Sequence, residues 1–248
     1  MAKSEKKVVY VDSKGKRLDG RKVDEMRPIK ITTGVLDRAD GSALIEWGQN
    51  KVFAAVYGPK EALPRHIANP YKAVIRYNYR MATFSVPDRK NPKPGRREIE
   101  ISKVSAEALE AVVLTERYPN TAIDVDVEVV DSNAGTRVAA LTAAAVAVAD
   151  AGIALKDLIA GVSIGKAGGN LLVDLNKDEE DAEDAVDIPI AIMPGSEQIV
   201  LLQLDGLLSK KEWSDALKMG LEACKKVNEL QRAALKEKFG RKEEKVSE

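Results

Sequence analysis

The segment Gly135-Thr136-Arg137 combines three residue types that suit the binding of an anion such as phosphate. It follows an alternating strand pattern and opens an Ala/Val-rich helix pattern, so the first helical amides are unpaired and face outward. The glycine lets the backbone approach a ligand closely, the threonine offers a hydroxyl donor, and the arginine offers a planar cationic fork. An ordinary helix start, capped by Ser132 or Asn133 and followed by a surface arginine, is the alternative interpretation.

A second cationic group, Arg96 and Arg97, lies where a loop over residues 87–95 with three prolines gives way to a helix pattern. We expect Arg97 to turn toward a bound anion and Arg96 to turn outward along a nucleic-acid backbone. Two solvated arginines at the end of a loop are the alternative.

The stretch from residue 174 to residue 187 is strongly acidic, with eight carboxylates and one lysine. Crowded carboxylates raise one another's pKa, which makes a carboxyl group a usable proton donor near neutral pH. Their oxygens are also the ligands that a hard divalent cation takes. Asp181 lies within this stretch, and Asp187 opens the following strand pattern. A solvated acidic loop is the alternative, and composition alone does not single out the carboxylates that matter.

Charge is divided along the chain although the formal net charge is zero. Residues 1–100 carry 22 Lys and Arg against 12 Asp and Glu, whereas residues 101–248 carry 17 against 27. A basic half favours contact with a polyanion such as RNA, through the release of its counterions. Together with the acidic stretch, this division predicts phosphate chemistry with Mg²⁺, although solvated loops or a subunit contact would leave the same pattern.

Counting excludes several other chemistries. The chain has one cysteine, Cys224, and one histidine, His66, so it has neither an intrachain disulfide nor a zinc site of the usual Cys/His composition. A Ser-His-Asp triad would need His66, and the sequence has no Gly-x-Ser-x-Gly elbow. The longest uncharged stretch of the apolar helix pattern, residues 138–149, is too short to span a membrane. Charges at positions 3 and 5–7 do not fit a signal peptide, so we expect a cytoplasmic protein without a membrane partner.

The elements that must position these residues follow from periodicity and turn signals. Strand groups followed by a helix occur twice, which predicts an α+β fold of two layers, in which duplicated units of mixed sheets pack on helices. Helices are predicted from about residue 99 to residue 117, from the Gly135 turn to about residue 151, and from about residue 210 to residue 238. Strands are predicted over residues 28–33, 42–47, 52–57, 74–81, 123–130, 158–165, 171–175, 188–193 and 198–204.

Four motifs in this order resemble those of the RNase PH family, and within it the catalytic ring subunit of the archaeal exosome. The likeness extends from about Val9 to Phe239, so we expect a single RNase PH-like domain over residues 1–248, with an ordered core at 9–239 and polar tails at 1–8 and 240–248. The motifs are Arg17-Leu-Asp-Gly-Arg21 with Glu25 and Arg27, the run from Gly95 to Glu100, Ala134-Gly135-Thr136-Arg137, and Asp181 six positions before Asp187.

The resemblance implies a 3′-to-5′ phosphorolytic exoribonuclease that depends on Mg²⁺ or Mn²⁺. In such an enzyme orthophosphate, the co-substrate, attacks the terminal phosphodiester of single-stranded RNA and releases a nucleoside diphosphate, and the reverse reaction adds RNA tails. By likeness, Arg97 and Gly135-Thr136-Arg137 would bind the orthophosphate, while Arg96 and Arg137 would also bind RNA. Asp181 would be the general acid. Asp187 would position it or, with Asp181, the metal.

The resemblance also implies partners. The family forms hexameric rings, and the archaeal version alternates the catalytic subunit with a related inactive one, as a trimer of heterodimers that carries RNA-binding cap subunits. Arg65 and His66 resemble residues at the narrow neck of the pore that contact RNA. Two further readings remain: a ring scaffold that binds RNA without catalysis, and a metal-dependent hydrolase that releases nucleoside monophosphates. A small-molecule kinase would need a Gly/Ser-rich phosphate loop, which the sequence lacks.

Overall fold

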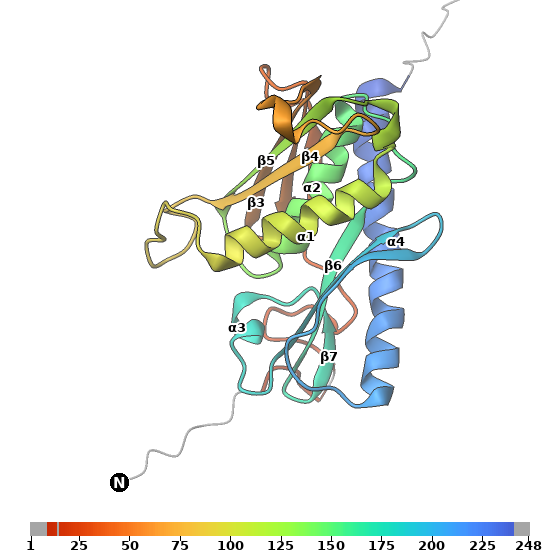
Figure 1. The fold of residues 1–248 in the computed structure, drawn as a ribbon. Coiled ribbons are helices and arrows are strands. Elements are labelled where there is room, and N and C mark those ends of the chain that lie inside the picture. The colour runs from red at the N-terminus through yellow and green to blue at the C-terminus, as the bar shows by residue number, and fades with distance from the viewer. Residues whose placement is uncertain (1–8, 14, 241–248) are drawn as a thin grey trace, which may run out of the picture.

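The structure is a computed structural model that describes residues 9–13 and 15–240. The predicted polar tails lie outside the described residues, apart from residue 240. Two β-sheets and the long helices make up the molecule, and Figure 1 shows α2 and α4 running beside both sheets. Buried side chains of both sheets and of these helices form one continuous hydrophobic cluster. Within the described part of the chain, no helix combines the length and apolarity needed to cross a membrane.

The first sheet has five strands in the order β1-β2-β3-β5-β4. All neighbours are antiparallel except β4 and β5, which run parallel, so this sheet is mixed. In β5 the valines alternate with acidic residues as the sequence predicted, and Val125, Val127 and Val129 are buried. The strands are β1 (Ile29–Thr33), β2 (Gly41–Trp47), β3 (Asn50–Glu61), β4 (Val74–Met81) and β5 (Thr121–Asp131).

The second sheet has four strands in the order β7-β6-β8-β9, and every pair in it is antiparallel. It follows the first sheet in the chain, with α2 packed between the two. The strands are β6 (Ala160–Ala167), β7 (Asn170–Val173), β8 (Val186–Met193) and β9 (Gln198–Leu202).

Helix α2 (Thr136–Asp150) is buried on almost every side, because alanine and valine let it pack closely against both sheets. Helix α4 (Lys210–Phe239) has an apolar face against β6 and an exposed charged face. Helix α1 (Arg96–Val112) packs on β4. The α+β class with sheets packed on helices is thereby confirmed.

Two helix predictions need correction. Helix α1 ends at Val112 and not near residue 117, because Val113 is extended and pairs with Leu155, in the connection between α2 and β6. A separate 3-10 turn, η2 (Thr115–Arg117), follows. The short helix α3 (Lys177–Glu180) was not predicted. Its start is a capping box in which Asn176 accepts from the Glu179 amide and Glu179 accepts from the Asn176 amide.

Candidate active site

The start of α2 has the backbone form expected of an anion-binding turn. Gly135 is the N-cap residue, in the left-handed region at φ 68° and ψ 14°, and no side chain caps the helix. The alternative of a cap by Ser132 or Asn133 is therefore wrong. The Asn133 side chain instead accepts a hydrogen bond from the Lys177 amide at 2.9 Å. The first amides of α2 are left without a side-chain acceptor, as an anion site requires.

The buried ion pair between Arg27 and Asp174 holds this turn in place through the two residues that precede Gly135. The Arg27 guanidinium lies 2.6 Å from Asp174 Oδ1 and donates to the carbonyl oxygens of Asn133 and Ala134, the two residues before Gly135. The Asn50 side chain donates a further hydrogen bond to the Ala134 carbonyl at 2.7 Å. Arg27 and Asp174 thus determine where the turn presents its amides.

The Arg17-Leu-Asp-Gly-Arg21 motif supports the same region without reaching its surface. Arg17 pairs with Glu179, and both side chains are fully buried. Arg21 donates to the Asp174 carbonyl at 3.0 Å. Two of the eight carboxylates in the acidic stretch, Asp174 and Glu179, are therefore committed to buried arginines, so they are not free to bind a metal or transfer a proton.

Thr136, the first residue of α2, is buried and keeps a hydroxyl hydrogen to donate. Its Oγ1 accepts from the Tyr79 hydroxyl at 2.9 Å. Burial raises the pKa of Tyr79, so the tyrosine stays protonated and has a hydroxyl hydrogen for this bond. In this arrangement the Thr136 hydroxyl hydrogen is not used in the bond with Tyr79.

Arg137 is partly buried and contacts two polar side chains from other elements. Its Nη1 donates to Gln203 Oε1, and its Nη2 lies 3.4 Å from Glu100 Oε2. Neither Gln203 nor Glu100 was predicted as a site residue. A single glutamine after a strand and a glutamate within a charged helix give no local signal in the sequence.

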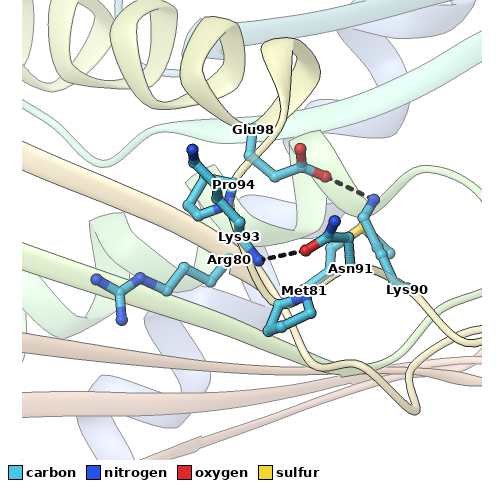
Figure 2. Close-up of a pocket in the computed structure, with 8 residues that line it drawn as sticks. Arg80, Met81, Lys90, Asn91, Lys93, Pro94 and Glu98 are labelled. Atoms are coloured by element: carbon cyan, nitrogen blue, oxygen red, sulfur yellow. Dashed lines mark hydrogen bonds and ion pairs between the residues drawn. The ribbon is translucent and has the colours of Figure 1, made fainter.

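Arg96 and Arg97 are exposed in the first turn of α1. The preceding loop is anchored to that turn, because Lys90 Nζ lies 2.5 Å from Glu98 Oε1, and Figure 2 shows the loop residues gathered around Glu98. Burial alone would raise the pKa of Glu98, but hydrogen bonds from Lys90 and from the Gly95 amide bring that pKa below its ordinary value. The anchored loop therefore fixes the position of the two arginines.

Asp187 is the second residue of β8 and lies among the charges of the site. Burial raises its pKa, against a hydrogen bond that the Ser163 hydroxyl donates to Oδ1. The negative charge of Glu180 raises the pKa further, whereas Arg137 and Arg97 lower it. Contacts bring the starts of α1 and α2 and the beginning of β8 together, because Arg137 and Glu100 both bind the Gln203 side chain, and the Gln203 backbone amide donates to the Pro189 carbonyl of β8. The structure thus brings together Arg97, the Gly135-Thr136-Arg137 turn and Asp187.

Asp181 follows α3, one residue after Glu180. Its side chain is 61% exposed, and Lys177 Nζ lies 2.6 Å from Oδ1. The hydrogen bond to Asp181 raises the pKa of Lys177. Asp181 is therefore accessible from solvent and paired with the Lys177 ammonium group.

The described residues could hold Mg²⁺ through one or two carboxylates, with phosphate and water as the remaining ligands. Among the described residues, no three Asp, Glu, His or Cys side chains are grouped as a ready-made metal site. Mg²⁺ often takes one or two carboxylates and obtains its other ligands from water and phosphate oxygens. Burial raises the pKa of Asp187 and the negative charge of Glu180 raises it further, and a bound cation would favour the ionised form of this carboxyl group.

Arg65 and His66 lie apart from these residues, in the 3-10 turn η1 (Arg65–Ile67). Both are exposed, and Arg65 Nε donates to Glu61 Oε1 at 3.3 Å. Strand β4 separates this turn from the loop that leads into α1, and Figure 1 shows η1 at the far end of the first sheet from α3. The structure does not join them to the cluster around Asp187.

Comparison with known families and proteins places the chain among ribonuclease-related proteins. Two family models match it: "3′ exoribonuclease family, domain 1" over residues 25–154 and "3′ exoribonuclease family, domain 2" over residues 157–223. The exosome complex component Rrp41 of Pyrococcus furiosus is 53% identical over 92% of this chain and 91% of that protein. Rrp41 of Methanopyrus kandleri is 53% identical over 93% of this chain and 96% of that protein.

Two solved structures share the fold. The crystal structure of rice Rrp46 superposes with a TM-score of 0.80 at 28% identity, over 89% of this chain and all of the rice chain. A chain of the Archaeoglobus fulgidus exosome, solved with RNA bound to the active site, superposes with a TM-score of 0.74 at 24% identity over 87% of this chain and 92% of that chain.

Proposed function

Since the chain belongs to the RNase PH family of 3′ exoribonucleases, we propose that it is the catalytic subunit of an exosome ring and degrades single-stranded RNA by phosphorolysis. The observation that carries the proposal is the uncapped turn at Gly135, which contacts between Arg137, Gln203 and Glu100 join to the α1 turn with Arg97 and to strand β8 with Asp187. An anion site beside a carboxylate with a raised pKa suits attack by phosphate on a phosphodiester.

In the proposed reaction an oxygen of orthophosphate attacks the last phosphorus of the RNA. The bond between that phosphorus and the 3′ oxygen of the preceding nucleotide breaks, and the terminal nucleotide leaves as a nucleoside diphosphate. The departing 3′ oxygen takes a proton and becomes the new 3′ hydroxyl. A phosphodiester is exchanged for a phosphoanhydride, so the reverse reaction adds nucleotides from diphosphates to RNA.

The arginines reduce the repulsion between the two anions that must meet. Arg97 and the Gly135-Thr136-Arg137 turn hold the orthophosphate, through guanidinium groups, backbone amides and the free hydrogen of Thr136. Arg96, exposed beside Arg97, and Arg137 hold the last phosphates of the RNA. Fixed positive charge at this point stabilises the negative charge that develops in the transition state.

Asp181 donates the proton to the departing oxygen, and Asp187 positions Asp181. Asp187 and Asp181 together would also hold a Mg²⁺ or Mn²⁺ ion. The 61% exposure of the Asp181 side chain supports this role, because the carboxyl group is accessible from solvent. The metal, when bound, would offset charge on the phosphate oxygens. Asp181→Asn is expected to abolish turnover and to leave RNA binding nearly unchanged. Unchanged turnover in this variant would refute the role of Asp181.

The proposed assembly is a hexameric ring in which this chain alternates with a related inactive subunit, as a trimer of heterodimers with RNA-binding cap subunits. It is supported by the identity to Rrp41 proteins, which are named as exosome components. Exposed Arg65 and His66, away from the Asp187 region, would contact the incoming RNA at the neck of the pore. Mixing with the ring partner is expected to increase activity, and equal specific activity with and without the partner would contradict that expectation.

Product analysis tests the proposed reaction. The chain, with and without its ring partner, is incubated with Mg²⁺ and single-stranded RNA labelled at its 3′-terminal nucleotide, in the presence or absence of orthophosphate. Release of nucleoside diphosphate only with orthophosphate supports phosphorolysis. Monophosphate release regardless of orthophosphate would indicate a hydrolase, and RNA binding without release would indicate a scaffold subunit.

A further inference from the structure

We propose that Gln203 is a positioning residue for Arg137, and that Glu100 fixes the orientation of the Gln203 amide. The inference rests on the proposed function, in which Arg137 binds phosphate. Gln203 directly follows β9, and its backbone N–H donates to the Pro189 carbonyl of β8 at 3.1 Å. The residue is therefore attached to the second sheet, whereas Glu100 belongs to α1 and Arg137 to α2.

The three side chains form a chain of hydrogen bonds with one permitted direction. Gln203 Oε1 accepts from Arg137 Nη1, and Gln203 Nε2 donates to Glu100 Oε1 at 2.6 Å. A guanidinium only donates and an ionised carboxylate only accepts. The amide must therefore present its oxygen to Arg137 and its nitrogen to Glu100, and a flipped amide would oppose donor to donor and acceptor to acceptor.

The contacts restrain the guanidinium and leave donors for a ligand. Of its five N–H groups, one on Nη1 contacts Gln203 and one on Nη2 lies near Glu100. The Nε of Arg137 is buried and has no hydrogen-bond partner within the described part of the chain. A buried donor is normally paired, so an unpaired one beside the uncapped start of α2 points to an acceptor that arrives with the substrate.

The restraint has a consequence for phosphate affinity. A long arginine side chain loses rotamer freedom when it binds an anion, and a side chain already held in place loses less. Gln203 therefore favours orthophosphate binding without touching the phosphate. Glu100 acts one step further away by holding the amide.

The test measures the KM for orthophosphate in phosphorolysis, the KM for RNA and kcat, with calorimetric titration of inorganic phosphate into the RNA-free protein. Gln203→Ala is expected to raise the KM and Kd for orthophosphate about 5- to 20-fold, less than the loss of a hydrogen bond made directly to the charged ligand, because Gln203 acts on the phosphate only through Arg137. The KM for RNA should rise less, because Arg137 is only one of several groups proposed to bind the RNA. Gln198→Ala, at the exposed start of β9, is the matched control and should leave all of these values unchanged.

A carboxylate swap separates positioning from a general structural role. Gln203→Glu opposes two carboxylates and should also raise the KM for orthophosphate. Adding Glu100→Gln lets the amide at position 100 donate to the carboxylate at position 203. The double variant should therefore regain most of the wild-type KM for orthophosphate. An unchanged KM in both Gln203→Ala and Gln203→Glu, with active wild-type protein, would overturn the inference and leave the proposed function intact. Absence of phosphorolysis in the wild-type protein would overturn both.

Discussion

Replacing Asp174 by asparagine is expected to destabilise the fold and to loosen the turn at Gly135. Asp174 is 2% exposed and accepts five hydrogen bonds through its two side-chain oxygens. Three come from Arg27, at 2.8 Å from its amide, 2.9 Å from Nε and 2.6 Å from Nη2. The others come from Trp47 Nε1 at 3.0 Å and Arg21 Nη1 at 3.3 Å.

Asparagine keeps the size of the side chain but removes the charge and turns amide hydrogens toward these donors. Removing one partner of a buried ion pair costs about 3–5 kcal/mol, because the remaining charge is left without compensation. In a chain of this size, each kcal/mol lowers Tm by about 2–4 °C, so Asp174→Asn should lower Tm by roughly 6–20 °C. Arg27 would also hold the carbonyls of Asn133 and Ala134 less firmly, so the Kd for orthophosphate should rise.

Thermal unfolding followed by circular dichroism measures the first effect, and calorimetric titration with orthophosphate below the lower Tm measures the second. Asp178→Asn is the matched control, because Asp178 is an exposed aspartate of the same acidic stretch. A Tm for Asp174→Asn within about 2 °C of the wild-type value would refute the argument, since one kcal/mol alone should shift it by that much.

Three further changes test other parts of the structure. Gly135→Ala places a side chain at φ 68° and should cost roughly 1–2 kcal/mol in chemical denaturation, with weaker orthophosphate binding; an unchanged unfolding midpoint would contradict this. The pKa of Glu98 lies below its ordinary value of 4.5, so its contribution to stability is present above that value and is lost as the pH falls through the folded pKa. Glu98→Gln should therefore destabilise the protein more at pH 7 than at pH 3, and an equal difference at both would count against the ion pair with Lys90. Burial raises the pKa of Cys224 to about 12, so iodoacetamide should label this thiol only after unfolding, and rapid labelling of the folded protein would show that it is accessible.

The fold could largely be predicted from local pattern. β5 alternates valine with acidic residues, and α2 is a run of alanine and valine between two glycines, so both have the period of their element. The end of α1 could not be predicted, because residues 113–117 are compatible with a helix and the bridge from Val113 to Leu155 overrides that preference. Helix α3 was not predicted, because it has only four residues and its capping-box glutamate, Glu179, is one of several neighbouring acidic residues.

The candidate site could be predicted only in part. Arg97, Arg137 and Asp187 were identifiable from motifs, and the elements that carry them are joined through the contacts of Gln203 with Arg137, Glu100 and Pro189. The different roles of the acidic residues depend on partners far away in sequence. Glu179, for example, pairs with Arg17 across 162 positions, and no local spacing reveals such a contact. Gln203 is a similar case, since its relation to Arg137 follows only from the packing of the second sheet beside α2.

The most direct test of the central claim follows the oxygen atoms of orthophosphate. The ring assembled from this chain and its partner is supplied with single-stranded RNA, Mg²⁺ and orthophosphate labelled with ¹⁸O, and the released nucleotides are analysed by mass spectrometry. Phosphorolysis predicts nucleoside diphosphates that carry the label in the β-phosphoryl group. Unlabelled nucleoside monophosphates, with incorporation of ¹⁸O only from labelled water, would contradict the account.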